Sequence, residues 1–294
     1  GDQLASLLLG SISGGQISTN NFISSEKIAW AFYGQDDWKV TPKLTINLGL
    51  RYELFSPISE KFARQSNFDY DTLTLQIPKG KDQNAALPPN FSQQFPNVTV
   101  ARGQVSKYLI PWDKTNFGPR IGIAYTIRPK TVVRVGYGVF YGGEENQGGN
   151  PNRGESAPFN ESPSLNRTTE GQFDPNHYFA NVAPTGGVSV GYPTNVFTTL
   201  PVQLQFRAIA NDFRNSLVHK WNLAVQQELP GQMALEVAYI GNHQAHQLLQ
   251  PDPNACPNTP VVGATCNESL RPTKSIGGIQ GTASFGYGNY NALT

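Results

Sequence analysis

Hydrophobic and polar residues alternate along several stretches of the chain, most clearly at residues 43–54, KLTINLGLRYEL. Apolar side chains fill every second position there, and Thr, Asn, Gly, Arg and Glu fill the positions between them. Period two over this length predicts a β-strand with one apolar and one polar face. The aromatic-rich residues 27–40 precede it across a Thr-Pro pair, which is a tight-turn signal. The pattern therefore predicts a hairpin.

Two further parts of the chain repeat this plan of strand, short Pro-containing turn and strand. The turns read Arg-Pro-Lys in one case and Pro-Gly in the other, and each separates two alternating stretches of about ten residues or more. A seventh strand is expected to start near Tyr287. The predicted hairpins lie at about residues 27–54, 116–141 and 217–242, and the Pro-, Gly- and Asn-rich segments at about 55–115, 142–215 and 243–286 are predicted to be long loops.

The predicted strands are too long for an ordinary soluble sandwich, whose strands run to about five or six residues. Twelve residues at about 3.3 Å each, tilted near 40°, rise roughly 30 Å, which is enough to cross the apolar band of a membrane. Short turns at one end and long loops at the other are typical of bacterial outer-membrane barrels. The sequence thus predicts an all-β fold, an antiparallel up-and-down meander of about six full strands, too few to close a barrel alone.

The two strand faces receive opposite assignments in this prediction. Aromatic residues such as Trp38 and Trp221 suit the interfacial girdles of a barrel, although aromatics favour any strand. Charged residues on the polar face fit a wet lumen, or the outside of a soluble sheet, but not a dry core. The residues expected to face lipid are Leu44, Ile46, Leu48, Leu50, Ile121, Ile123, Val133, Val135, Leu223, Val225, Leu235 and Val237, and those expected to face the lumen are Asn47, Arg51, Glu53, Arg120, Arg134, Lys220 and Glu236.

Composition supports the all-β class. The 294 residues include 29 Gly and 22 Pro and only 15% charged residues, which is poor material for helices. The net charge is +1 with scattered Lys and Arg, so no nucleic-acid partner is expected. No run approaches the length of a membrane-spanning helix. The mean hydropathy of −0.38 resembles that of a soluble protein, but alternating barrel strands have a similar average, so it does not exclude a membrane barrel. The predicted location is the outer membrane of a Gram-negative-type bacterium.

Few residues suggest chemistry of their own. Cys256 and Cys266 lie at the two ends of a short Pro- and Gly-rich segment. This arrangement favours a local structural disulfide between them and disfavours a metal site. His243 and His246 have HxxH spacing, but a role at a loop rim is favoured because they follow a predicted strand end. The acidic Gly-rich run at 142–155 lacks the spacing of a known Ca²⁺ loop and is expected to be a solvated loop, with Ca²⁺ binding left open.

No enzyme motif stands out in the sequence. It contains neither GxSxG nor HExxH, and no Gly-rich loop has the strand–loop–helix setting of a phosphate site. The prediction is therefore a protein that is not an enzyme, without a cofactor and without a catalytic residue.

The three hairpins resemble successive barrel segments of the Oar-like TonB-dependent receptors of acidobacterial type, in the strings FYGQDDWKVTPKLTINLGLRYE, NFGPRIGIAYTIRPKTVVRVGYGVFYG and WNLAVQQELPGQMALEVAYIGNHQAHQL. The resemblance implies a 22-stranded barrel with an N-terminal plug that imports a ligand with energy from the TonB system. Its partners would be outer-membrane lipid, the TonB system through the plug, and an unknown ligand. Plug and signal peptide are expected outside this chain, which would be a fragment of the barrel domain.

Three functions remain open on this basis. The first is uptake of a substrate, and the second is adhesion or secretion-linked interaction at the cell surface on the same barrel. The third is a soluble β-rich domain that binds or hydrolyses carbohydrate. A soluble domain would bury its apolar strand faces against a second sheet, whereas a barrel turns them outward as one band.

Overall fold

The structure is a computed structural model. It describes residues 22–88, 91–142, 158–159, 204, 206–256, 270–274 and 276–294, and the backbone of 14–16 and 164–166. Among the described residues, no helix is both long and apolar enough to cross a membrane.

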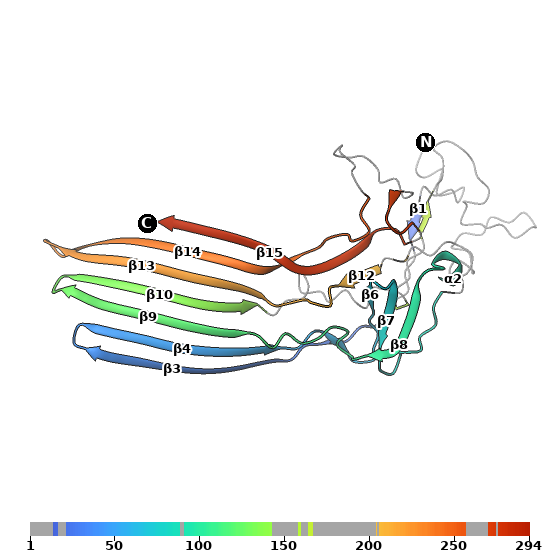
Figure 1. Cartoon of the computed structure of the whole chain (residues 1–294), viewed down its shortest axis with the longest axis horizontal. Helices are drawn as coiled ribbons and strands as arrows, with labels where there is room; N and C mark the ends of the chain where they lie inside the picture. Colours follow the sequence, from blue (N-terminus) through green and yellow to red (C-terminus); the bar gives the residue numbers. More distant parts are fainter. Residues whose placement is uncertain are drawn as a thin grey trace, which may run out of the picture.

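One eight-stranded sheet dominates the molecule (Figure 1). Neighbouring strands within this sheet are antiparallel, except that one short strand at an edge pairs in parallel with the strand beside it. The all-β class is confirmed, and the sheet is open because its two edges do not meet. In order across the sheet, the strands are β12 (Phe206–Ile209), β15 (Ile279–Leu293), β14 (Met233–Leu249), β13 (Ser216–Leu229), β10 (Thr131–Gly142), β9 (Phe117–Arg128), β4 (Leu44–Phe55) and β3 (Ala29–Thr41).

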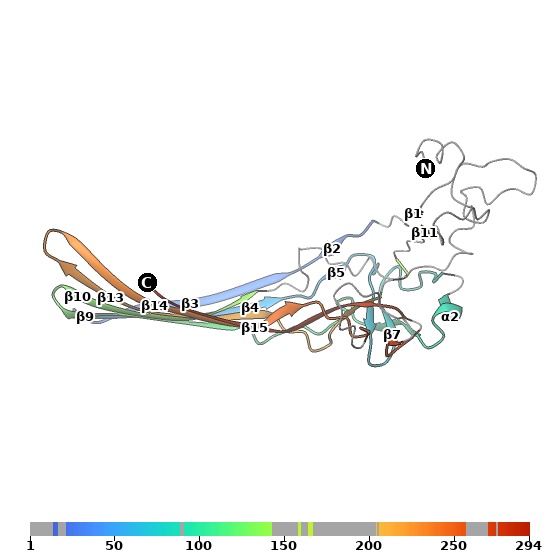
Figure 2. The ribbon, with the colours of Figure 1, turned by 90° about the horizontal axis from the view of Figure 1, so that it is seen from above.

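The three hairpins β3–β4, β9–β10 and β13–β14 are joined by short turns at one end of the sheet, on the left in Figure 1. In the last turn Gly231 has a φ of +79° and Gln232 a φ of +60°. Only glycine adopts the first of these without strain, which explains the Pro-Gly pair. The long connections leave from the opposite end, and Figure 2 shows the long strands as one curved layer.

The third hairpin and the last strand are longer than the sequence predicts. β14 continues to Leu249, and the seventh long strand, β15, begins at Ile279, eight residues before the start expected near Tyr287. Register shifts after Gln244 and Gln247 carry the pairing past the point where the alternation ends. The prediction placed His246 beyond the strand because both faces are polar there, and period two gives no signal in such a segment.

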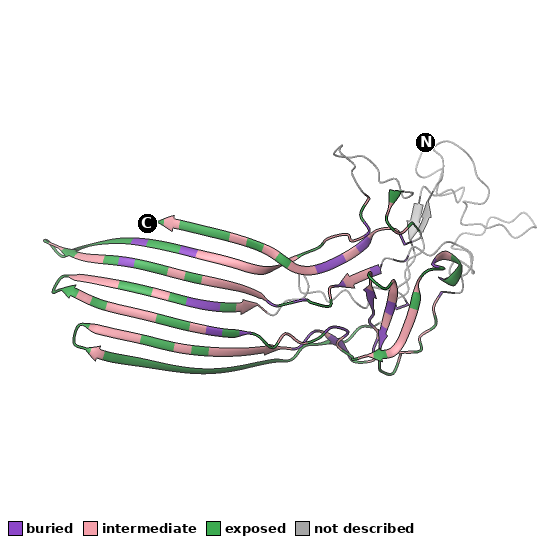
Figure 3. Ribbon diagram, viewed as in Figure 1, coloured by how far each residue is buried: buried purple, intermediate pink, exposed green. Residues whose placement is uncertain are grey.

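The described parts of the predicted loops fold together into a compact unit that we call the loop body. It contains a three-stranded sheet and a short helix, and its core brings together parts of all three long connections. Buried residues gather here and in the adjoining strand ends (Figure 3). Its elements are β6 (Asn67–Asp69), β7 (Thr74–Pro78), α2 (Phe91–Gln94) and β8 (Thr99–Val105), and its core is Phe68, Leu75, Phe91, Phe95, Leu204, Phe206, Ile276 and Ile279.

Two small strand pairs complete the described elements. β2 (Ser25–Glu26) pairs with β5 (Ser59–Glu60), and β1 (Gly14–Gln16) pairs with β11 (Ser164–Asn166). The buried Glu60 carboxylate accepts hydrogen bonds from the backbone N–H groups of Ser24, Phe62 and Arg64. It thereby satisfies donors that the short β2–β5 pair leaves unpaired.

Buried asparagines tie the loop body together. The Asn67 amide donates to the carbonyl of Ile209 at 3.1 Å and accepts its N–H at 2.7 Å, which joins the first connection to the second. The Asn254 amide donates to the carbonyls of Thr273 and Gly277 and accepts from the Tyr70 hydroxyl, which joins the first connection to the third. Both side chains are almost fully buried, so these protein hydrogen bonds replace the hydrogen bonds that each amide would make to water.

Candidate functional site

The strand register assembles one continuous apolar face. Across the middle of the sheet a single row of directly paired residues consists of aliphatic and aromatic side chains and contains no charged one. All twelve residues predicted to face lipid lie on this same side, and many are exposed, as Leu50 is at 51%. In the described part of the chain this face is not covered by a second sheet, as a soluble sandwich would require. The row is Trp38, Ile46, Ile123, Val135, Leu223, Tyr239 and Leu293.

One charge interrupts the apolar face at the edge of the sheet. Asp36 on β3 lies directly opposite Leu48, on the side that the alternation of β4 makes apolar. The sequence of β3 has no clean period two, so no face could be predicted for Asp36 from the sequence alone. Substitutions in the uncharged row beside Asp36 therefore test lipid contact without interference from a nearby carboxylate.

The seven residues predicted to face the lumen all lie on the opposite, polar face. Here Arg51 contacts Glu53 at 2.9 Å on the same strand, and the Arg134 guanidinium donates to Gln226 across strands at 2.7 Å. Asn47 donates to Asp37, its direct cross-strand partner. These contacts hold polar side chains in fixed positions over the sheet.

An aromatic ring with two cations lies on the polar face near the loop body. The Arg120 guanidinium lies 4.7 Å from the centre of the Phe140 ring, and the Lys220 ammonium lies 5.5 Å from it. Gly138 makes room for this cluster, because an added Cβ would lie 3.0 Å from the ring. Cation–π attraction stabilises the cluster and keeps two positive charges on this surface. The sequence predicted both cations here but not Phe140, which lies two residues from Gly138 on the same face.

Three polar side chains fasten the strand ends where the long connections begin. Asn116 is fully buried, and its amide donates to the carbonyls of Glu53 and Asp113 and accepts from the Asn215 amide. Asp113 accepts from the Asn215 backbone N–H at 2.9 Å. Together Asp113, Asn116 and Asn215 form a unit that we call the rim clamp, which links β4, β9 and β13. The sequence offered one signal for it, since each Asn directly precedes a strand.

The rim clamp is predicted to loosen in acid. Burial by itself raises the pKa of the Asp113 carboxyl, but hydrogen bonds from Thr115 and Asn215 and the charge of Arg214 outweigh burial and hold the pKa below its ordinary value. A lowered pKa in the folded state means that the carboxylate stabilises the clamp above its unfolded pKa of about 3.9 and loses this effect as the pH falls through the lowered value. Hydrogen-exchange protection of the Asn215 amide is therefore expected to drop across this acidic range. In Asp113→Asn, protection should be weaker at neutral pH and nearly independent of pH, and an unchanged acid response in this variant would contradict the prediction.

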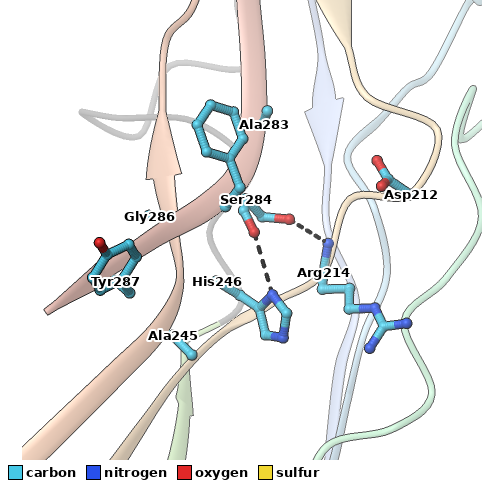
Figure 4. Close-up of a pocket in the computed structure, with 9 residues that line it drawn as sticks. Asp212, Arg214, Ala245, His246, Ala283, Ser284, Gly286 and Tyr287 are labelled. Carbon is cyan, nitrogen blue, oxygen red and sulfur yellow. Dashed lines mark hydrogen bonds between the residues drawn. The ribbon is translucent and has the colours of Figure 1, made fainter.

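A cavity of about 460 Å³ opens where β14 and β15 meet the loop body (Figure 4). The Arg214 backbone N–H donates to the Ser284 hydroxyl at 2.8 Å, and the His246 ring lies 3.3 Å from the Ser284 carbonyl through Nδ1. His246 has a φ of +55°, which places its ring in the cavity wall at the irregular part of β14. With the exposed aromatic rings of Phe285 and Tyr287 beside Arg214, the wall suits an anionic or aromatic group.

Among the other residues that the sequence suggested for metal binding or a disulfide, those that the structure describes do not come together in one site. His243 and His246 share no partner, because the first contacts Asn289 and the second Ser284. Cys256 is disulfide-bonded, while Cys266 lies outside the described residues, so the pairing of the two stays a prediction. The acidic run at 142–155 also lies almost wholly outside them. Within the described ranges, no group of three or more His, Cys, Asp or Glu side chains is arranged to hold a metal ion.

A family model described as outer membrane beta barrel domain matches residues 1–294. Among solved structures, the siderophore receptor PirA from Pseudomonas aeruginosa is similar over 91% of this chain and 30% of its own, with 11% identity and a TM-score of 0.37. The FrpB iron transporter from Neisseria meningitidis (F5-1 variant) is similar over 92% of this chain and 24% of its own, with 9% identity and a TM-score of 0.40. The chain thus spans less than a third of either protein. The comparison with curated proteins found no match.

Proposed function

Because the chain belongs over its whole length to the outer membrane beta barrel domain family, we propose that it forms part of the barrel wall of a TonB-dependent receptor that takes up a substrate. Family membership confirms the predicted location in the outer membrane of a Gram-negative-type bacterium. The Oar-like character of the receptor and its use of the TonB system rest on the resemblance of the three hairpins. The proposal gives the chain neither a catalytic role nor a cofactor.

The observation that carries the proposal is the two-sided sheet. Its apolar row crosses seven strands without a charged side chain, and its other side carries Arg120, Arg134 and Lys220. In the proposed orientation the apolar side contacts outer-membrane lipid and the polar side lines a wet lumen, because charges are tolerated only there. Arg120 and Lys220, which lie beside the Phe140 ring, would then place a positive patch on the lumen wall near the loop body.

The loop body takes the external end in this proposal. Bacterial barrels have short turns in the periplasm and long loops outside, and the three short turns here lie opposite the loop body. The cavity beside Arg214 opens at the junction of sheet and loop body. The loop body would therefore be the first part of the chain to meet a ligand.

Uptake is tested with cells that carry or lack the full-length protein. Both strains are grown in one defined mixture of oligosaccharides, peptides and ferric chelates, and the loss of each compound from the medium is followed by mass spectrometry. We expect one class of compound to be depleted only when the receptor is present and the proton-motive force is intact. A matched strain with Arg120→Ala and Lys220→Ala should deplete the same class more slowly at equal receptor abundance.

Two outcomes would count against uptake. One is equal depletion with and without the receptor, and the other is depletion that continues after the proton-motive force is dissipated. If receptor-free cells also lose attachment to surfaces or to other cells, the protein acts in adhesion on the same barrel.

A further inference from the structure

We propose that His219 and His243 form a binding site for one divalent transition-metal ion of the Cu²⁺ or Zn²⁺ class. The two residues are direct cross-strand partners on β13 and β14, on the apolar face near its loop end. Their ring centroids lie 6.1 Å apart. One ion with metal–nitrogen bonds of about 2.0–2.1 Å spans this separation between two imidazoles.

Hydrogen bonds on both flanks orient the two rings. The Tyr137 hydroxyl lies 2.8 Å from Nδ1 of His219, and Nδ1 of His243 lies 2.7 Å from Oδ1 of Asn289. Because an amide oxygen only accepts, the contact with Asn289 fits the His243 tautomer that carries its proton on Nδ1 and leaves the Nε2 lone pair for a metal ion. The Tyr137 hydroxyl accepts as readily as it donates, which allows the same tautomer at His219. Such partners are what fix metal-binding histidines in proteins.

The arrangement of four adjacent strands directs both Nε2 atoms toward the space between the histidines. Tyr137 is on β10 and Asn289 is on β15, so the two Nδ1 atoms point away from each other. The two nitrogens of an imidazole lie on nearly opposite sides of the ring. The two Nδ1 contacts imply that the Nε2 atoms of His219 and His243 tilt toward the space between the rings. No third histidine or carboxylate joins them in the described part of the chain.

The surroundings leave the remaining coordination positions open. Both histidine side chains are half-buried and lie near the loop end of the apolar face, so in the proposed orientation an ion reaches them from the headgroup region of the membrane. On the turn side, Trp221 lies against Gly241, where an added Cβ would collide with the indole. Two imidazoles with open positions favour Cu²⁺ over Zn²⁺ by intrinsic affinity. Water or a phosphate oxygen completes the coordination.

The test is a titration of the detergent-solubilised full-length protein with Cu²⁺ alone, followed by electron paramagnetic resonance. We expect one Cu²⁺ per chain with two imidazole nitrogens as ligands. His219→Ala and His243→Ala should each weaken this site at least ten-fold. Asn289→Ala should weaken it about ten-fold while both imidazoles stay coordinated, because it removes only an orienting hydrogen bond. The matched control, His246→Ala, should change nothing.

Two results would overturn the site. The first is a wild-type spectrum without a two-nitrogen copper centre, a result that needs no variant to fold. The second is copper binding of unchanged affinity and nitrogen number in a folded His219→Ala, His243→Ala double variant. If the alanine variants fail to fold, His219→Gln and His243→Gln keep a polar side chain at each position and are expected to show the same loss.

Discussion

Replacing Phe206 with alanine is expected to destabilise the loop body by about 3–5 kcal/mol, the usual cost of removing a large buried aromatic side chain. Phe206 is fully buried, and its ring centroid lies 4.5 Å from that of Phe68 and 5.1 Å from that of Phe95. Removing the Phe206 ring would leave a new cavity in the core, at the point where the first and second long connections meet. Hydrogen exchange of the β6–β8 amides in the full-length protein measures the effect.

A surface phenylalanine provides the control for this variant. Phe22 is 91% exposed, so Phe22→Ala should leave exchange in β6–β8 unchanged. The long hairpins should keep their protection in both variants, because their ladders do not depend on the loop core. Wild-type protection of β6–β8 in Phe206→Ala would mean that the shared core does not hold the connections together.

Replacing Val135 with arginine is expected to destabilise the complete barrel by about 2–4 kcal/mol. Val135 is directly paired with Ile123 on one side and Leu223 on the other, in the row without charged side chains. In the proposed orientation an arginine there would be placed in hydrocarbon with no carboxylate among its direct cross-strand partners. The measurement is the free energy of unfolding of the full-length protein in lipid vesicles.

Two matched variants distinguish lipid contact from a general intolerance of arginine. Asn47→Arg lies on the polar face opposite Asp37 and should be tolerated. Leu48→Arg lies on the apolar face but opposite Asp36, so a cross-strand ion pair should reduce its cost below that of Val135→Arg. Equal stability of Val135→Arg and Asn47→Arg would show that the apolar face does not contact lipid.

Local patterns in the sequence were sufficient to predict the hairpins and the two faces. Period two identifies a strand and its orientation together, and a short turn then sets the register of its partner. His219 and His243, for example, each lie twelve positions from Gly231, so counting from the turn pairs them without a structure. The resemblance to TonB-dependent receptors rests on the same strands, and its coarser part, an outer membrane beta barrel domain, is confirmed by the family model.

The loop body was not predictable in the same way. Phe68, Phe206 and Ile279 belong to one core but are separated by more than seventy residues at each step of the chain. No period links such residues, because their contacts arise from tertiary packing alone. The rim clamp and the far end of β14 were missed for a related reason, since both depend on partners from other strands.

The buried asparagines of the loop body have a consequence for how such surfaces diverge. Asn67 bonds to Ile209, Asn254 bonds to Tyr70, and β12 pairs with β15, so each connection is tied to both others. If one connection were replaced by that of a related receptor, the new segment would have to pack against the two unchanged connections at the same time. Recombination should therefore succeed when the three connections are inherited as a set, and chimaeras that exchange only one of them should misassemble.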